Sequence, residues 1–291
     1  MTLTRIALST GVELDVQLAG AEDAPAVILL HGFPESHRTW RHIVPDLARD
    51  HRVVVPDQRG YASSSKPTAV ADYTPDRIVG DLIALADALG IGRFTLVGHD
   101  WGGAVAWMAA LTRPDRIERL VIVNAPHPLI FQRSLFDDAD QRAASQYITR
   151  FRDTGLDQGL VGAGLERFFG SSFAHHVTKA IAGEDKAAYL DEWSQPGAMT
   201  AMLNWYRASS IVVPAPGEDP PRPAFLDAPF PPVMQRTLVV WGTGDKALLP
   251  VQLEGLDALV PDLTVTKVDA GHFVPWENPQ AVIAAMRDWG I

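Results

Sequence analysis

An aspartate stands at the centre of a glycine-rich turn in the stretch LVGHDWGGAVAWMAAL, where Gly98 and Gly102 flank Asp100. The stretch reads as a buried strand over residues 93–97 that turns sharply into an apolar-faced helix. A G-x-nucleophile-x-G turn of this kind holds one side chain on a strained backbone at the end of a strand. The two glycines let the backbone pass close to itself. Asp100 is therefore the candidate nucleophile.

The carboxylate at this position, where serine is the usual residue, narrows the chemistry. Serine attacks a carbonyl carbon and leaves an ester that water can open, whereas its attack on a saturated carbon would leave an ether. A carboxylate that attacks a saturated carbon gives an alkyl ester, which water can then cleave at the carbonyl. Asp100 therefore predicts displacement at a saturated carbon, either the opening of an epoxide or the expulsion of a halide.

A base and an acid that orients it are expected at the ends of two later strands. His272 follows the last predicted strand, and Asp245 follows the strand TLVVWG. The order nucleophile, acid, histidine is that of the α/β-hydrolases. The other common position for the acid, after the strand IERLVIV, holds Asn124. Asp245 is therefore the predicted acid, and His272 the predicted base.

The leaving group decides between the two reactions. Two main-chain amides, those of Trp101 and of Phe33 in the HGFP loop, are expected to stabilise the tetrahedral intermediate in either case. The alkoxide that leaves when an epoxide opens requires a proton donor, whereas a departing halide requires only N–H donors that bind the anion. Of the five tyrosines, Tyr61 and Tyr73 lie in the predicted core, and Tyr147, Tyr189 and Tyr206 lie in a region that reads as helical throughout.

The elements that must position these residues alternate between strands and helices. Strands are expected in an N-terminal hairpin (4–10 and 12–19) and at 26–30, 51–56, 93–97, 117–123, 237–242 and 263–272, with helices at 75–89, 250–260 and 279–289. This alternation predicts an α/β fold, with a mostly parallel eight-stranded sheet and helices on both faces.

The pattern changes in the middle of the chain. From about residue 129 to 210 it reads as helical and rich in aromatic residues, and a proline-dense stretch follows, typical of an extended connector. We therefore predict two parts of one α/β core, 1–128 and 233–291. An all-helical cap with its proline-rich return linker, 129–232, is inserted at the carboxyl ends of the strands, where open sheets bind ligands.

Composition excludes several other classes. The chain has 291 residues and no cysteine. Its net charge of −10 argues against nucleic acid or an anionic membrane as a partner. No apolar run approaches a membrane span and no signal pattern opens the chain, so a cytoplasmic location is expected. His175 and His176 have no third ligand at useful spacing, so no metal is expected. His31 and His99 are expected to brace loops beside the site.

The whole chain resembles the epoxide hydrolase family of the α/β-hydrolase superfamily. The match is carried by HGFP at 31–34, GHDWGG at 98–103, NAPHP at 124–128, SQYITRF at 145–151, NWYR at 204–207, WGTGD at 241–245 and GH at 271–272. The resemblance implies that Tyr147 and Tyr206 bind and protonate the ring oxygen while Asp100 attacks a ring carbon. Water activated by His272 would then hydrolyse the ester to a vicinal diol, with no cofactor.

The expected ligands are a small apolar epoxide and water, in a pocket lined by Phe33, Trp101, Phe151 and Trp205. A homodimer is compatible with the sequence. Haloalkane dehalogenases share the GHDW motif, but often carry a halide-binding Asn where Phe33 stands. Fluoroacetate dehalogenases use an Arg near the nucleophile, where this chain has Trp101 and Ala104. A haloalkane dehalogenase and a non-catalytic ligand-binding protein of this fold are the alternatives.

Overall fold

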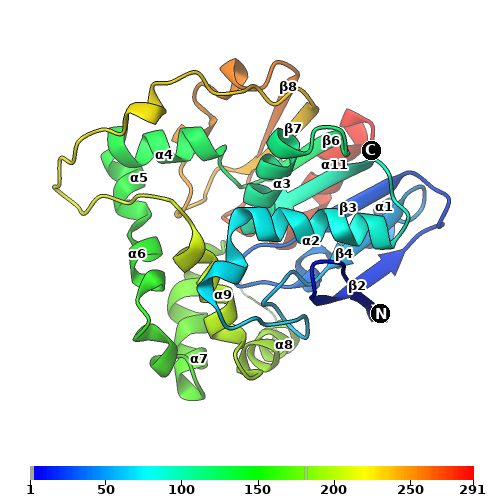
Figure 1. Ribbon diagram of the computed structural model, residues 1–291, viewed down its shortest axis with the longest axis horizontal. Coiled ribbons are helices and arrows are strands. Elements are labelled where there is room, and N and C mark those ends of the chain that lie inside the picture. The colour runs from blue at the N-terminus through cyan, green and yellow to red at the C-terminus, as the bar shows by residue number, and fades with distance from the viewer. Residues whose placement is uncertain (1–2, 180, 182) are drawn as a thin grey trace.

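One eight-stranded sheet organises the computed structural model, which describes residues 3–179, 181 and 183–291 (Figure 1). The strands are β1 (Leu3–Ala7), β2 (Glu13–Ala19), β3 (Ala26–Leu30), β4 (Arg52–Pro56), β5 (Phe94–His99), β6 (Ile117–Val123), β7 (Arg236–Gly242) and β8 (Leu263–Val268). Their order is β1-β2-β4-β3-β5-β6-β7-β8. β2 pairs antiparallel with β1 and β4, and all the other pairs are parallel. The predicted fold class is confirmed.

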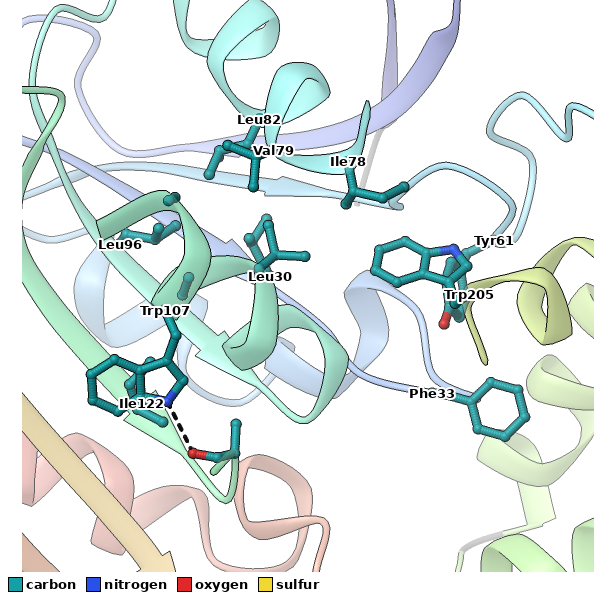
Figure 2. Close-up of a cluster of buried hydrophobic side chains, with 14 of the residues drawn as sticks. Leu30, Phe33, Tyr61, Ile78, Val79, Leu82, Leu96, Trp107, Ile122 and Trp205 are labelled. Carbon is teal, nitrogen blue, oxygen red and sulfur yellow. Dashed lines mark hydrogen bonds between the residues drawn. The ribbon is translucent and has the colours of Figure 1, made fainter. Parts of the chain in front are cut away.

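Helices cover both faces of the sheet, which explains why its central strands are continuous apolar runs. Alternate residues of β3 face opposite sides, so that Leu30 packs with α2 (Pro75–Ala88) and α3 (Trp101–Thr112), and Leu29 packs with α1 (Val44–Leu47) and α11 (Pro279–Trp289). Figure 2 shows the first of these clusters, in which the buried indole of Trp107 donates a hydrogen bond to the Ala125 carbonyl at 3.2 Å. The two cores fix the carboxyl ends of the strands.

The described residues between β6 and β7 contain helices and no strand. The α-helices are α4 (Pro128–Asp137), α5 (Ala139–Ala144), α6 (Gln146–Arg152), α7 (Ala163–Phe168), α8 (Gly183–Ser194) and α9 (Ala198–Ala208). Short turns at Leu156–Gly159, Phe169–Phe173 and Ala174–His176 join them, and one more, Ala224–Leu226, interrupts the proline-dense stretch. We call residues 128–208 the helical segment. In Figure 1 its green and yellow helices lie to one side of the sheet.

One predicted element is wrong in type. In place of a helix over 250–260, the chain forms two 3-10 turns, Pro250–Leu253 and Leu256–Ala258, separated by Gly255 in a left-handed conformation (φ 71°). A residue at positive φ ends a helical run, and glycine adopts this conformation without steric cost. The remaining short helices are α10 (Val274–Glu277) and the 3-10 turns His37–Trp40 and Val70–Tyr73.

None of the helices in the described residues combines the length and the apolar content that a bilayer crossing requires.

Candidate active site

Asp100 lies at the sharp turn between β5 and α3, with φ 49° and ψ −120°. A non-glycine residue in this region is strained by about 1–3 kcal/mol, and such strain persists where the surroundings hold it. The surroundings here are tight. A Cβ on Gly98 would lie 2.3 Å from the Gly102 carbonyl oxygen, and one on Gly102 would lie 2.3 Å from that of Leu30. The two glycines therefore allow the close packing that turns the Asp100 side chain out of the strand.

The two carboxylate oxygens of Asp100 face different partners. Oδ1 accepts a hydrogen bond from the Phe33 amide at 2.7 Å, and Oδ2 lies 3.5 Å from Nε2 of His272. Phe33 therefore occupies the predicted donor position. Among the described contacts, the amide of Trp101, the other predicted donor, makes no hydrogen bond to this carboxylate.

His272 and Asp245 are hydrogen-bonded, with 2.7 Å between Nδ1 and Oδ2. Asp245 is buried, and its Oδ1 accepts from the amides of Ala247 at 2.8 Å and Leu248 at 2.9 Å. The side-chain amide of Asn124 donates to Oδ2 at 2.7 Å. The structure thus brings together the three polar residues that the sequence singled out. The sequence showed Asn124 only as a residue that occupies the other common position for the acid. The structure gives Asn124 a further role, because its side chain holds Asp245 in place.

Burial and charge oppose one another in this group. Burial disfavours the charge on His272, but the carboxylates of Asp245 and Asp100 outweigh it and raise the pKa of His272 well above its usual value. Burial would also raise the pKa of Asp100, yet the hydrogen bond and positive charge of His272 hold it below its usual value. The pKa of Asp245 is lowered in the same way, against burial, by the charge of His272 and by its hydrogen-bond donors. Each group therefore favours the ionised form of its neighbour.

The His272 backbone is tied to both neighbouring segments. Its carbonyl lies 2.9 Å from Nε2 of His99, and its amide donates to the His176 carbonyl at 3.1 Å. His99 is fully buried, and its Nδ1 lies 2.7 Å from Oε2 of Glu35. His99 therefore braces this loop as predicted, and His31 braces the turn before Gln58, whose amide donates to Nε2 of His31 at 3.0 Å.

Glu277 is a second residue that the sequence did not single out. Its buried carboxylate accepts from the amides on either side of His272, those of Gly271 at 3.2 Å and Phe273 at 3.0 Å, and from the amide of Thr178 at 2.6 Å. Thr178 follows the turn Ala174–His176 of the helical segment. The Glu277 carboxylate therefore joins the helical segment to residues 269–273, which we call the His272 loop.

Glu277→Ala is expected to lower the free energy of unfolding by about 2–4 kcal/mol, because buried amide donors left without an acceptor each cost about 1–3 kcal/mol. Urea unfolding measures the change. Glu254→Ala, which removes an exposed carboxylate at the end of the turn Pro250–Leu253, is the control. Equal stability of the two variants would contradict this role for Glu277.

Tyr147 of α6 and Tyr206 of α9 face one another, with ring centroids 6.1 Å apart and nearly perpendicular planes. Tyr206 also packs edge-to-face on the rings of Phe33 and Trp101, each at 5.1 Å. Burial raises the pKa of both phenols, and the charge of Asp100 adds to the effect. Both hydroxyls therefore stay protonated near neutral pH.

Two cavities meet at these tyrosines, because Asp100, Tyr147 and Tyr206 line both of them. The larger, of 310 Å³, is bordered mainly by apolar side chains, and the smaller measures 190 Å³. Of the four residues predicted to line a pocket, Trp101 and Trp205 border the larger cavity, and Phe33 and Phe151 border the smaller one.

No cluster of three or more metal-ligating side chains occurs among residues 3–179, 181 and 183–291. His176 borders the smaller cavity, and His175 lies beside it with 5.4 Å between the ring centroids.

The family model and the relatives of this chain agree on the α/β-hydrolase superfamily. The family model for the alpha/beta hydrolase fold matches residues 25–279. The chain is 34% identical to the AB hydrolase superfamily protein YfhM of Bacillus subtilis (strain 168), over 94% of this chain and 93% of that protein. It is 30% identical to Epoxide hydrolase 2 of Caenorhabditis elegans, over 93% of this chain and 75% of that protein.

Solved structures agree with these relatives. A structure described as one of the novel epoxide hydrolases of the alpha/beta hydrolases superfamily in metagenomes from hot environments is 48% identical. It superposes with a TM-score of 0.93, over 99% of this chain and 98% of that one. A mutant of an epoxide hydrolase from Bacillus megaterium is 29% identical, with a TM-score of 0.85 over 98% of this chain and 99% of that one. The predicted resemblance is confirmed, and the chain belongs to the epoxide hydrolase family of the α/β-hydrolase superfamily.

Proposed function

We propose that this protein is an epoxide hydrolase, which opens an epoxide to a vicinal diol through a covalent ester on Asp100. One observation carries the proposal. A carboxylate on a strained turn and two protonated phenols border the same two cavities, and a histidine held by a second carboxylate stands behind the first. The names of the relatives, several of which are epoxide hydrolases, support the same activity.

The first step forms the ester. The Phe33 amide holds Oδ1 of Asp100, which becomes the carbonyl oxygen of the ester, so Oδ2 is the oxygen that attacks the ring carbon. The carbon–oxygen bond of the ring breaks as the new bond forms. Tyr147 and Tyr206 hydrogen-bond the departing oxygen, and one of them gives it a proton, because an alkoxide is far more basic than a phenolate.

The second step hydrolyses the ester. Esterification removes the negative charge of Asp100 and with it one of the causes that raise the pKa of His272, so the imidazole is more readily neutral at this stage. Its Nε2 takes a proton from water while the hydroxide adds to the ester carbonyl. The amides of Phe33 and Trp101 stabilise the oxyanion. As the intermediate collapses, the proton of its added hydroxyl passes to the departing alkoxide, which leaves as the diol and restores the Asp100 carboxylate. The proton on His272 then returns to the tyrosinate.

The helical segment brings both tyrosines to the carboxyl ends of the strands. We propose that residues 129–232 form the cap and its return linker, and that 1–128 and 233–291 form the core. The proposed chemistry uses water as its only co-substrate and requires no cofactor or metal. A cytoplasmic location and a homodimeric assembly stay predictions.

A panel of terminal, aryl and bulky epoxides beside haloalkanes tests the proposed function, with diol and halide both measured. Diol from epoxides, lost in Asp100→Ala, is expected. Halide release that survives Tyr206→Phe would instead favour a haloalkane dehalogenase. Tight binding with no turnover above that of Asp100→Ala would favour a non-catalytic binding protein.

A further inference from the structure

Arg150 is an exposed arginine at the border of the smaller cavity. No described residue forms an ion pair or a hydrogen bond with its guanidinium. Arg152, two residues further along the same helix, is by contrast held by the Tyr206 carbonyl at 2.9 Å and by the hydroxyl of Ser209 at 2.8 Å. The Arg150 guanidinium is therefore free to bind an anion at the border of this cavity.

The position of Arg150 on its helix directs it toward the reacting groups. Arg150 and Phe151 follow Tyr147 by three and four residues on α6, the spacing at which side chains share one face of a helix. All three border the smaller cavity. Arg150 therefore lies on the same side of α6 as the proposed proton donor.

The rest of the cavity wall suits a polar anionic group. Ser172 and His176 border it with a hydroxyl-bearing side chain and an imidazole, and Ser171, which also borders it, donates its hydroxyl to the Arg167 carbonyl at 2.8 Å. Nδ1 of His176 is buried without a hydrogen-bond partner in the described residues, and burial lowers the pKa of this imidazole to about 4, so the ring is neutral at pH 7 and can donate one hydrogen bond. Asp100 is the one carboxylate among the described residues that border this cavity.

The larger cavity has the opposite character. Asp100 is again the one charged residue among those described on its wall, and the wall is otherwise formed mainly by aliphatic and aromatic side chains such as Ile78, Val105, Met108, Leu129 and Phe230. A disubstituted epoxide whose ring lies between Asp100 and the two tyrosines can therefore extend one substituent into the apolar larger cavity and the other into the smaller cavity that Arg150 borders.

We infer that the smaller cavity binds a carboxylate carried on a short arm of the substrate, paired with Arg150, while the larger cavity takes an apolar substituent. This inference rests on the proposed function and specifies its substrate as a disubstituted epoxy acid. The planar guanidinium matches a carboxylate with two parallel hydrogen bonds. Without it, the charge of Asp100 and the net charge of the protein would repel an anionic substrate. The cavity volume of 190 Å³ limits the arm to a few carbons.

Matched acids and amides test the inference. The probes are trans-2-phenyloxiranes that carry at ring carbon 3 a carboxylate, an acetate or a propanoate arm, each with its neutral primary amide. For at least one arm length, the wild type is expected to show a higher kcat/KM for the acid than for the amide. Arg150→Gln is expected to lower this acid-to-amide ratio roughly five- to twentyfold, between the effects of exposed and of charge-assisted contacts. Arg150→Lys is expected to retain part of the preference.

Arg167→Gln is the control. Arg167 is an exposed arginine of α7 that borders neither cavity, and its replacement should leave the ratio unchanged. An acid-to-amide ratio that is the same in the wild type and in Arg150→Gln, with the amides still converted to diols, would overturn the inference and leave the proposed function intact. If the wild type opens none of the probes and does not open styrene oxide, the proposed function fails and the inference fails with it.

Discussion

His272→Gln is expected to stop turnover while leaving the first chemical step intact, so that the protein accumulates as its ester. Attack on the epoxide needs Oδ2 of Asp100, the Phe33 amide and the two tyrosines, and none of these is removed. Hydrolysis of the ester needs a base beside the carbonyl, and Nε2 of His272 lies 3.5 Å from Oδ2 of Asp100. A positioned general base contributes roughly 10²–10⁴ in rate, and turnover should fall by at least that factor.

Mass spectrometry of the intact protein after rapid quenching measures the accumulation. The His272→Gln protein should gain the mass of one epoxide within the first turnover and retain it, whereas the wild type should show the adduct only transiently. The doubly substituted protein, Asp100→Asn with His272→Gln, is the control and should gain no mass. Steady turnover by His272→Gln within about threefold of the wild type would contradict the role of this base.

The double substitution Tyr147→Phe and Tyr206→Phe is expected to have the second largest effect, and to slow the first step, in which the ester forms. Burial keeps both phenols protonated, and without them the departing oxygen has no donor. Formation of the ester should slow by roughly 10²–10⁴, the usual contribution of a general acid. Each single substitution should have a smaller effect, because the other hydroxyl remains. Single-turnover rates of adduct formation measure this step directly.

Tyr189→Phe provides a matched control for the tyrosines. Its hydroxyl is buried without a hydrogen-bond partner in the described residues, and it borders neither cavity. Removing that hydroxyl should leave the rate of adduct formation within about twofold of the wild type, because the hydroxyl borders neither cavity and cannot donate to the departing oxygen. An equal loss in the control and in the double variant would mean that packing, and not proton donation, explains the effect.

Much of the fold follows from local sequence. β6 and α11 have the predicted bounds, Ile117–Val123 and Pro279–Trp289, because a continuous apolar run and a proline at the first helical turn are both local signals. The error at 250–260 is local too. Its apolar residues have helical spacing, but Gly255 at positive φ divides them, and the sequence alone did not show which conformation that glycine adopts.

The candidate site was predictable where a residue sits at the end of a strand, and was not where a contact joins distant segments. Asp100, Asp245 and His272 follow strands that the sequence identifies. Asn124 contacts Asp245 across 121 positions of the chain, and Glu277 reaches Thr178 across 99. Their partners depend on how β6 lies beside β7, and on how the helical segment meets the His272 loop. No periodicity or motif in one sequence encodes these contacts.

The covalent ester on Asp100 is the central claim, and one turnover in ¹⁸O-labelled water tests it most directly. With enzyme in excess over epoxide, the oxygen added to the diol should come from the Asp100 carboxylate and be unlabelled, and the label should instead be found in Asp100 after digestion of the protein. Diol labelled by solvent in that first turnover would show that water attacks the epoxide directly, and would contradict the account.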